Sequence, residues 1–537
     1  MSSTKAEGQK PMNVLFIMCD QLRWDYLSCY GHPHLHTPHI DRLAERGVRF
    51  NRAYVQSPIC GPSRMSFYTG RYVSSHGSTW NNVPLKVGEL TLGDHLRGLG
   101  VDTVLCGKTH MKADKEGMER LGIEPDSIIG VRASECGFDV WERDDGLHPS
   151  SAYDPDPKYD DYLREKGWND PNPWQNVANS GEAEDGTLQN GWFLQHSDKA
   201  ARVAEEDSET PYMTRRAMAF IEQAGDTPWC LHLSYIKPHW PYIAPAPYHN
   251  MYGPEHFLPV VRDEGELVDP HPVFKAFLEE RTARNFAKDH VRETVLKGYM
   301  GLIKQIDDQM GELMAFLEAR GLTETTMIVF TSDHGDYMGD HFMGEKDLFH
   351  EPSVRVPLII VDPRAEADAT RGSTSDALVE AIDLAPTFVE FCGGTPRREI
   401  LEGKSLLPIL HGTADKVRDF TVSEYDYALR VGTDAVGVEP HQATLTMVFD
   451  GRWKYVHAET MRPMLFDLES DPNEFKDLGA DPDYENQRAR MRDLHYAFAR
   501  RQSQRTTISD KQMKAQLGGA DKAGVIIGAW DESDLAQ

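Results

Sequence analysis

The chain has 537 residues, of which 57 are Lys or Arg and 85 are Asp or Glu, so its formal net charge is -28 at pH 7. This acidic balance argues against binding to nucleic acid and to anionic membrane surfaces, since both require basic patches. Apolar residues make up 40% of the chain and charged residues 26%, as in soluble globular proteins. The length favours about two to four domains.

The N-terminal region carries no recognisable targeting signal. No stretch reaches the roughly 18 apolar residues of a transmembrane helix. The apolar run at 14–19 is short, ends at Asp20 and is not followed by a small-residue cleavage pattern. We therefore expect a cytoplasmic protein, although a mature chain whose signal had been removed would look the same. The 7 cysteines are scattered and odd in number, which disfavours a disulfide framework.

Short apolar runs alternate with helical patterns up to about residue 415, which predicts an α/β domain. The strand candidates are 14–19, 103–106, 229–234, 327–332 and 356–361. Thr37 and Pro38 predict the N-cap and first turn of a helix that runs to Arg46 and stops at Gly47. The longest helical pattern covers 289–320 and is closed by Gly321.

Residues 114–212 are rich in Asp, Glu, Gly, Pro and Trp without periodicity, and we interpret them as long insertions over one face. Trp168, Trp174 and Trp192 in this region either line an aromatic pocket or anchor the loop, and anchoring is favoured.

The pattern changes after residue 418. An Asp-Gly turn at 450–451 between two apolar runs predicts a hairpin, followed by a strand at 464–468 and a helix at 483–501. We expect a catalytic α/β domain over 1–418, a small α+β domain over 419–501, and a tail over 502–537. The tail is either an arm that packs on a neighbouring subunit or a flexible end.

Polar side chains end several predicted strands. One strand ends at Asp20 and another at Asp333-His334. Ligands collect at the carboxyl ends of strands in open α/β sheets, so these residues are expected to converge. Two carboxylates and an imidazole predict a divalent metal site, whereas the alternative is that each Asp simply caps a turn.

Two more strands run into a Lys with a His two residues later. The first pair is Lys108 and His110, and the second is Lys237 and His239. Such pairs can bind an anion and move protons. For either pair taken alone, a solvated lysine and a satisfied loop histidine is the preferred interpretation.

Residues 58–71 contain a cysteine at the start of a predicted helix. Pro62 suits the first turn and Gly70 suits the end of this helix, so Cys60 lies just before its N-terminus. The backbone N–H groups there favour an anion, and Arg64 is one turn further on. An ordinary thiol in this position could itself be a nucleophile.

The order Cys-Gly-Pro-Ser-Arg at 60–64 and Thr-Gly-Arg at 69–71 resembles the signature of the formylglycine-dependent sulfatases, near the arylsulfatase and phosphonate monoester hydrolase branch. Tyr68 departs from the leucine usual in that family. Further blocks resemble the family in order over about 12–480. The resemblance implies the fold of the alkaline phosphatase superfamily, a large mixed sheet sandwiched by helices plus a small C-terminal α+β domain with an antiparallel sheet.

The resemblance also implies a cofactor and a modified residue. Cys60 would be oxidised to formylglycine, whose hydrate is the nucleophile, by a formylglycine-generating system. Asp20, Asp333 and His334 would hold one divalent metal ion together with the modified Cys60. Gln21 stands where many sulfatases have a second acid, and its carbonyl oxygen would complete the site. A nitrogen ligand shifts the expectation from calcium toward manganese, and both stay open.

The remaining roles follow from the same resemblance. Arg64 would hold the formylglycine hydrate. Lys108, His239 and Lys346 would bind the sulfate oxygens, with His239 or Lys346 at the leaving oxygen. His110 would be the base that restores the aldehyde, and Asn81 is assigned to substrate binding. We also expect a homo-oligomer, with a dimer favoured.

Two alternatives compete with a sulfatase for small-molecule sulfate esters. Residues 241–249 and 81–85 resemble blocks of phosphonate monoester and phosphodiester hydrolases, which use the same nucleophile on phosphonate esters. That branch tends to have tyrosine and threonine where this chain has Lys108 and His110, which favours sulfate, although one site could serve both esters. The second alternative is a non-catalytic anion- or metal-binding protein in which Cys60 remains a thiol.

Overall fold

A central mixed sheet organises the computed structural model, which describes residues 12–146, 158–431, 433–501 and 507–516. The sheet has 9 strands. In pairing order they are β12 (Ser373–Ser375), β2 (Val48–Tyr54), β11 (Arg355–Val361), β10 (Thr326–Ser332), β1 (Asn13–Asp20), β8 (Trp229–Pro238), β3 (Asp102–Gly107) and β4 (Asp139–Arg143), with β13 (Val379–Glu380) also paired to β2. The five strands predicted from apolar runs are all present.

The middle of the sheet is parallel and one side is antiparallel. Strand β1 pairs in parallel with β10 and β8, and β8, β3 and β4 continue in parallel. Strand β11 is antiparallel to both β10 and β2. Parallel strands are buried on both faces, which explains why they read as continuous apolar runs.

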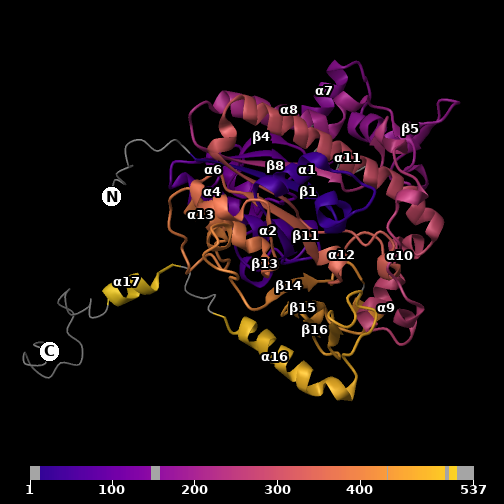
Figure 1. Ribbon diagram of the computed structural model, residues 1–537, viewed down its shortest axis with the longest axis vertical. Coiled ribbons are helices and arrows are strands. Elements are labelled where there is room, and N and C mark those ends of the chain that lie inside the picture. The colour runs from indigo at the N-terminus through magenta and orange to yellow at the C-terminus, as the bar shows by residue number, and fades with distance from the viewer. Residues whose placement is uncertain (1–11, 147–157, 432, 502–506, 517–537) are drawn as a thin grey trace, which may run out of the picture.

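Helices cover both faces of this sheet (Figure 1). Phe16 and Met18 of β1 belong to one core, and Leu15 and Ile17 belong to the other, because alternate side chains point to opposite faces. The first core is closed by α2 (Cys60–Thr69), α4 (Leu92–Arg97) and α13 (Leu384–Phe391), and the second by α1 (Pro38–Arg46), α8 (Glu209–Ala224) and α11 (Asp289–Ala319). The sandwiched mixed sheet expected from the sequence is confirmed.

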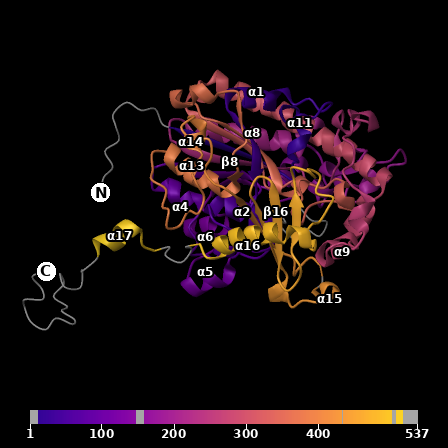
Figure 2. The same ribbon diagram turned by 60° about the horizontal axis from the view of Figure 1, so that its bottom comes forward.

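A second, antiparallel sheet follows in the C-terminal part. It consists of β14 (Thr421–Asp426), β15 (Thr444–Phe449), β16 (Trp453–Ala458) and β17 (Met464–Asp467). Helix α16 (Glu485–Ala499) lies against this sheet, as Figure 2 shows, and its Met491 and Phe498 share a core with residues of the sheet. The predicted hairpin, strand and helix are therefore present. Helix α17 (Asp510–Ala515) stands away from the body in Figure 2, and residues 502–506 and 517–537 of the predicted tail lie outside the described residues.

One local prediction is confirmed and another is wrong. Helix α1 runs from Pro38 to Arg46 between Thr37 at the N-cap position and Gly47, as predicted, but the Thr37 hydroxyl bonds Ser28, and the Asp307 carboxylate accepts from the first turn. The region 114–212 is not wholly irregular. It contains α5 (Lys115–Leu121), α6 (Ile128–Ser134), α7 (Lys158–Glu165) and β4, which pairs with β3. Helices of 7 or 8 residues are too short to show a clear period.

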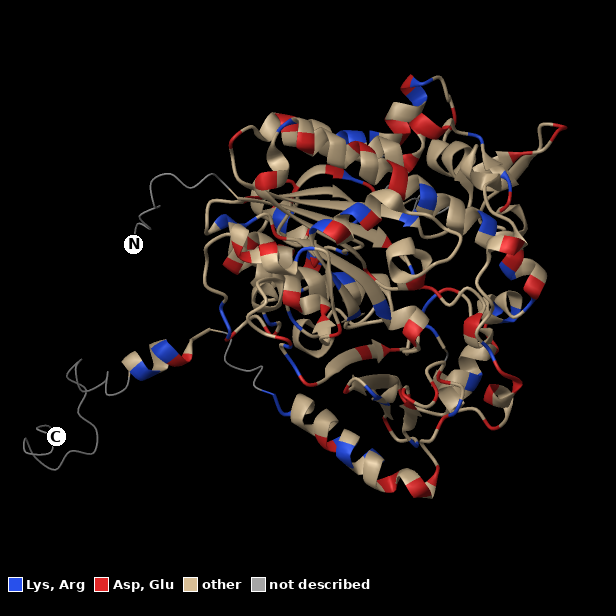
Figure 3. Ribbon diagram, viewed as in Figure 1, with Lys and Arg blue, Asp and Glu red and all other residues tan. Residues whose placement is uncertain are grey.

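The surface mixes both signs of charge. Figure 3 shows Lys and Arg interspersed with Asp and Glu along the outer helices. No helix within the described ranges combines the length and apolarity needed to cross a bilayer. All 7 cysteines are free thiols.

Candidate active site

The functional side chains gather where four neighbouring strands end. Asp20 is the last residue of β1, Asp333 follows β10, Lys108 follows β3, and His239 follows β8. These strands lie side by side in the order β10, β1, β8, β3 and run in parallel, so their carboxyl ends form one edge. Residues more than 300 positions apart therefore meet, as the strand-end pattern predicted.

Four buried groups form the centre of the site. The ligand atoms of Asp20, Cys60, Asp333 and His334 all lie within 4.8 Å of one another. The Cys60 Sγ atom is 3.1 Å from His334 Nε2 and 3.7 Å from Asp20 Oδ1. Two carboxylates and an imidazole fit a divalent cation, and the Cys60 thiol lies beside them. We call these four residues and Arg64 the reactive cluster.

Gln21 turns its amide oxygen toward the cluster. Its Nε2 donates to the Tyr242 hydroxyl at 2.9 Å and to the Asp336 carboxylate, which leaves Oε1 3.3 Å from Lys346 Nζ. The backbone of Gln21 has φ 66°, a strained conformation for this residue type. Burial raises the pKa of Asp336 to about 6, against the hydrogen bonds from Tyr242 and Gln21. The sequence interpretation missed Asp336, although its position three residues after Asp333 was a usable signal.

Arg64 holds the two carboxylates in place. It is fully buried on α2, where Nε donates to Asp333 at 2.7 Å and one terminal nitrogen donates to Asp20 at 3.2 Å. The other terminal nitrogen donates to the Ser234 hydroxyl at 2.8 Å and to the Lys108 carbonyl at 2.9 Å. Buried charges need such pairing. Arg64 therefore fixes the positions of Asp20 and Asp333, the two carboxylates among the predicted metal ligands.

Two lysines and a histidine surround the Cys60 side chain. Lys108 Nζ lies 2.6 Å from Asp20 Oδ2, and Lys346 Nζ lies 2.9 Å from Cys60 Sγ and 3.4 Å from His239 Nε2. Burial alone would raise the pKa of Asp20, but the charge of Lys108 holds it well below its usual value. The site therefore supplies the local positive charge that an anionic substrate requires in an acidic protein.

The Cys60 thiol is a poor nucleophile in this environment. Burial and the charge of Asp20 raise its pKa to about 12, although Lys346 and Lys108 act in the opposite direction. Without a bound cation the thiol therefore stays protonated at neutral pH, and the thiolate is the nucleophilic form of cysteine.

His110 and Asn81 lie at the edge of the site. The Asp145 carboxylate accepts from the backbone N–H groups of Thr109 and His110, at 2.9 and 3.0 Å, and holds this turn. Burial and the charge of Lys108 keep the pKa of His110 well below 6.5, so its ring is neutral. Asn81 Oδ1 accepts from the Gly61 N–H at 2.7 Å and thereby fixes the start of α2.

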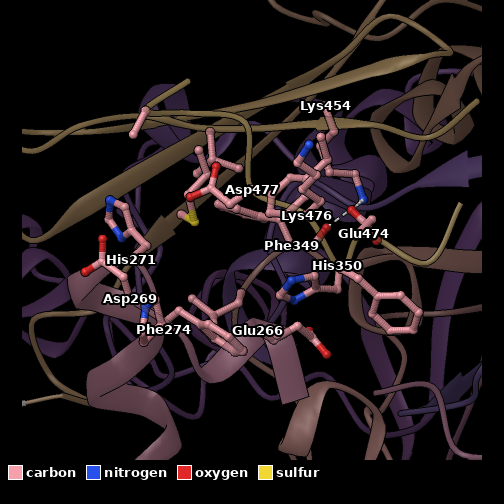
Figure 4. Close-up of a pocket in the computed structure, with 18 of the residues that line it drawn as sticks. Glu266, Asp269, His271, Phe274, Phe349, His350, Lys454, Glu474, Lys476 and Asp477 are labelled. Carbon is pink, nitrogen blue, oxygen red and sulfur yellow. Dashed lines mark hydrogen bonds and ion pairs between the residues drawn. The ribbon is translucent and has the colours of Figure 1, made fainter. Parts of the chain in front are cut away.

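A separate cavity of about 300 Å³ lies between the C-terminal sheet and residues 265–274 (Figure 4). His271, His350, Lys454 and Glu474 are among its lining residues, and Lys454 Nζ pairs with Glu474 at 2.6 Å. None of the predicted site residues lines this cavity.

Comparison with known proteins identifies the family. The profile of the family described as Sulfatase matches residues 12–394, and that of the N-sulphoglucosamine sulphohydrolase C-terminal region matches residues 339–501. The multifunctional alkaline phosphatase superfamily protein PehA of Trinickia caryophylli is 32% identical, over 88% of this chain and 92% of that protein. The choline-sulfatase of Rhizobium meliloti is 28% identical over 88% and 83%.

Solved structures agree with this assignment. The phosphonate monoester hydrolase of Silicibacter pomeroyi superposes with a TM-score of 0.79 and 27% identity, covering 93% of this chain and 98% of that one. Its likeness extends through both sheets described above, since nearly the whole of each chain is matched. The chain therefore belongs to the sulfatase family of the alkaline phosphatase superfamily, and it is a hydrolase.

Proposed function

We propose that this sulfatase hydrolyses small-molecule sulfate monoesters, using a formylglycine made from Cys60 and one divalent metal ion. The observation that carries the proposal is the buried reactive cluster with Lys108 and Lys346 directed at it. A protonated, buried thiol explains why oxidation of Cys60 would be needed before the site can act. A formylglycine-generating system is the partner that this modification requires.

The metal ion and the formylglycine would each supply one kind of chemistry to the reaction. Asp20, Asp333 and His334 would hold the metal ion, with the Gln21 amide oxygen beside them, and the ion would act as a Lewis acid on the ester. The donor set admits calcium or manganese, and the imidazole favours manganese. The formylglycine hydrate would supply the hydroxyl that attacks sulfur.

The lysines neutralise charge on the substrate. Lys108 and Lys346 place ammonium groups where the sulfuryl oxygens gain negative charge during the reaction. His239 Nδ1 lies 2.7 Å from the Trp240 carbonyl, which can only accept, so Nδ1 carries the proton and Nε2 accepts from Lys346. The arrangement supports Lys346, rather than His239, as the donor to the leaving oxygen in this proposal. The neutral His110 is the base that restores the aldehyde.

A second activity in the same site is hydrolysis of phosphonate monoesters or phosphodiesters. Two observations favour it, the 32% identity to a multifunctional relative and the TM-score of 0.79 to a phosphonate monoester hydrolase. These esters also carry a single negative charge, so they match the same lysines. We propose sulfate esters as the main substrates because Lys108 and His110 are sulfatase-like.

We further propose a domain arrangement, an oligomeric state and a cellular location for the protein. A catalytic domain over 1–418 is followed by a small domain over 419–501, and the tail after 502 serves as an arm in a homo-oligomer, with a dimer favoured. We propose that the protein is located in the cytoplasm. Sedimentation of a chain truncated at residue 502 tests the arm, and an unchanged size would contradict it.

Turnover of para-nitrophenyl sulfate and of para-nitrophenyl phenylphosphonate tests the proposed function. Cys60→Ala is expected to lower turnover of both esters by at least roughly 10⁴-fold, because the nucleophile is lost. Cys392→Ala, a thiol outside the site, is the control and is expected to keep the wild-type rate. Chelation is expected to abolish activity, and the metal that restores it identifies the native ion. Full activity in Cys60→Ala would contradict the proposal.

A further inference from the structure

A second cavity lies beside the reactive cluster and is lined by aromatic side chains. Its volume is about 870 Å³. We call it the aromatic pocket, and the residues that matter for the argument are Trp192, Trp240, Tyr242, Phe286 and Glu345. Such concave, largely apolar sites with a few polar groups are typical of small-molecule binding.

The aromatic pocket is joined to the reactive cluster through two loops. Trp240 directly follows His239, and their rings are 6.0 Å apart. Glu345 directly precedes Lys346, whose Nζ contacts Cys60 Sγ at 2.9 Å. An ester held at Cys60 by its charged end would therefore find this pocket within reach of its other end.

The rings form a continuous wall. The rings of Trp240 and Tyr242 lie in nearly parallel planes and are stacked, with an interplanar angle of 3° and centroids 6.3 Å apart. Trp192 meets Trp240 edge-on at 5.9 Å, and Phe286 meets Tyr242 edge-on at 6.4 Å. Tyr242 and Phe286 are buried, whereas Trp192 and Trp240 are half-buried. Both tryptophans line the pocket.

Polar contacts hold the wall in position. The Trp192 indole N–H donates to Gln175, and the Trp174 indole N–H donates to the buried Glu209 at 2.8 Å. Lys237 Nζ donates to Asn179 at 2.6 Å, which ties this segment to the strand that leads to His239. Trp174 is therefore the anchor favoured by the sequence, and Trp192 takes the pocket-lining role that was considered less favourable.

The charge at the base of the pocket is already neutralised. Glu345 lies 3.8 Å from Lys346 and 3.2 Å from Arg430. A carboxylate with two cationic partners offers little attraction to a cationic ligand, so Glu345 does not favour a cationic organic group over an aromatic one. Aromatic rings pack on one another by stacking and edge-to-face contacts.

We propose that Trp192 and Trp240 are specificity-determining residues that bind the organic part of the ester and select aryl over alkyl groups. This inference rests on the proposed function, since it concerns the leaving group of the same reaction. The metal and the lysines bind the charged end, and the aromatic pocket binds the ring.

The proposed selection is tested with an aryl and an alkyl ester. The measured quantity is the ratio of kcat/KM for naphthyl sulfate to kcat/KM for trifluoroethyl sulfate. The ratio between the two esters is expected to fall about tenfold in Trp240→Ala and in Trp192→Ala, because aryl stacking is lost. Because Trp192 packs on Trp240, the neighbour of His239, disturbance of His239 is excluded by an unchanged kcat/KM for trifluoroethyl sulfate in both variants. Trp168→Ala is the matched control, since this insertion residue faces Arg202 at 5.2 Å and does not line the pocket. It is expected to leave the ratio unchanged.

Binding provides a readout that does not depend on turnover. In the Cys60→Ser protein, calorimetry is expected to show an about tenfold weaker Kd for naphthyl sulfate after either tryptophan is replaced. Inorganic sulfate is the second probe, and its Kd is expected to stay the same. Equal weakening for both ligands, or none for either, would overturn the inference. A wild-type protein inactive on both esters would contradict the proposed function alone, since the binding result still decides the role of the pocket.

Discussion

The reactive cluster and the aromatic pocket are neighbours but are built by different means. Cys60, Asp333 and the rest of the cluster come from strand ends and the first turns of α2, and every member is buried with charged or hydrogen-bonding partners. The wall of the pocket comes from surface segments and keeps half-exposed rings at Trp192 and Trp240. The comparison indicates that the core preorganises the groups that carry the chemistry. The choice of organic group depends instead on a region that can vary independently of the reactive cluster.

The largest expected effect of breaking the cluster is on stability. Arg64→Met removes the partner of two buried carboxylates, which is expected to lower the free energy of unfolding by about 3–5 kcal/mol in chelator-treated protein. Urea denaturation measures it. The control is Arg46→Met, which breaks an exposed ion pair with Glu318 and is expected to cost less than about 1 kcal/mol. Similar losses in both variants would show that the cluster is no more tightly coupled than the surface.

Loss of the Lys346 ammonium group is expected to affect catalysis more than folding. Lys346→Met deletes the ammonium group 2.9 Å from Cys60 Sγ and is expected to lower kcat by roughly 10²–10³-fold, as loss of a preorganised donor does. Steady-state kinetics with para-nitrophenyl sulfate provide the measurement. Lys416→Met, at a side chain 71% exposed, serves as the control. A change confined to KM would argue that Lys346 binds the ester without assisting its cleavage.

The core beneath the cluster predicts a pH dependence of stability. His232 bonds the Phe16 carbonyl and the Tyr68 hydroxyl, and burial, followed by the charge of Arg64, lowers its pKa to about 3. The unfolded chain binds a proton near pH 6.5 while the native state does not, so this contribution is complete above pH 6.5 and is lost as the pH falls toward 3.

Between pH 7 and pH 5 the loss from His232 is about 2 kcal/mol. His232→Asn is therefore expected to lose about 2 kcal/mol less stability than the wild type over this interval. Urea denaturation at the two pH values measures the difference, with His34→Asn, on an exposed loop, as the control. An unchanged pH dependence in His232→Asn would show that this ring is already protonated in the native state.

The smallest expected effect concerns the anchoring of the pocket wall. Asn179→Ala removes the acceptor of Lys237 Nζ and is expected to cost about 1 kcal/mol, because the Pro241 carbonyl remains as a partner. The ratio of kcat/KM for naphthyl sulfate to kcat/KM for trifluoroethyl sulfate is also expected to fall in this variant. Asn51→Ala, on the surface, is the control. A stability loss without a change in the ratio would separate the anchor from substrate selection.

The sequence was informative where buried strands carry the residues. Apolar runs ending at Asp20 and before Asp333 predicted both the sheet and the convergence of these carboxylates, because a strand buried on both faces has few alternatives. The Asp-Gly turn at 450–451 similarly predicted the hairpin. The roles of Arg64, Lys108 and Lys346 came from the resemblance to sulfatases.

Contacts between distant segments could not be predicted. The bond of Gln21 to Asp336 joins residues 315 positions apart, and the acceptor for the first turn of α1 is Asp307 rather than the adjacent Thr37. The position of Trp192 depends on how several short elements pack. No local periodicity records such packing, which is why the sequence favours an anchoring role for Trp192 while the structure places it in the pocket lining.

Peptide mass spectrometry over residues 58–71 of protein from its own host, alongside turnover of para-nitrophenyl sulfate by the same preparation, tests the central claim most directly. An aldehyde in place of the Cys60 thiol, in a preparation that cleaves the ester, is the predicted result. An unmodified thiol in protein that is inert to both the sulfate and the phosphonate ester would contradict it and would leave an anion- or metal-binding protein.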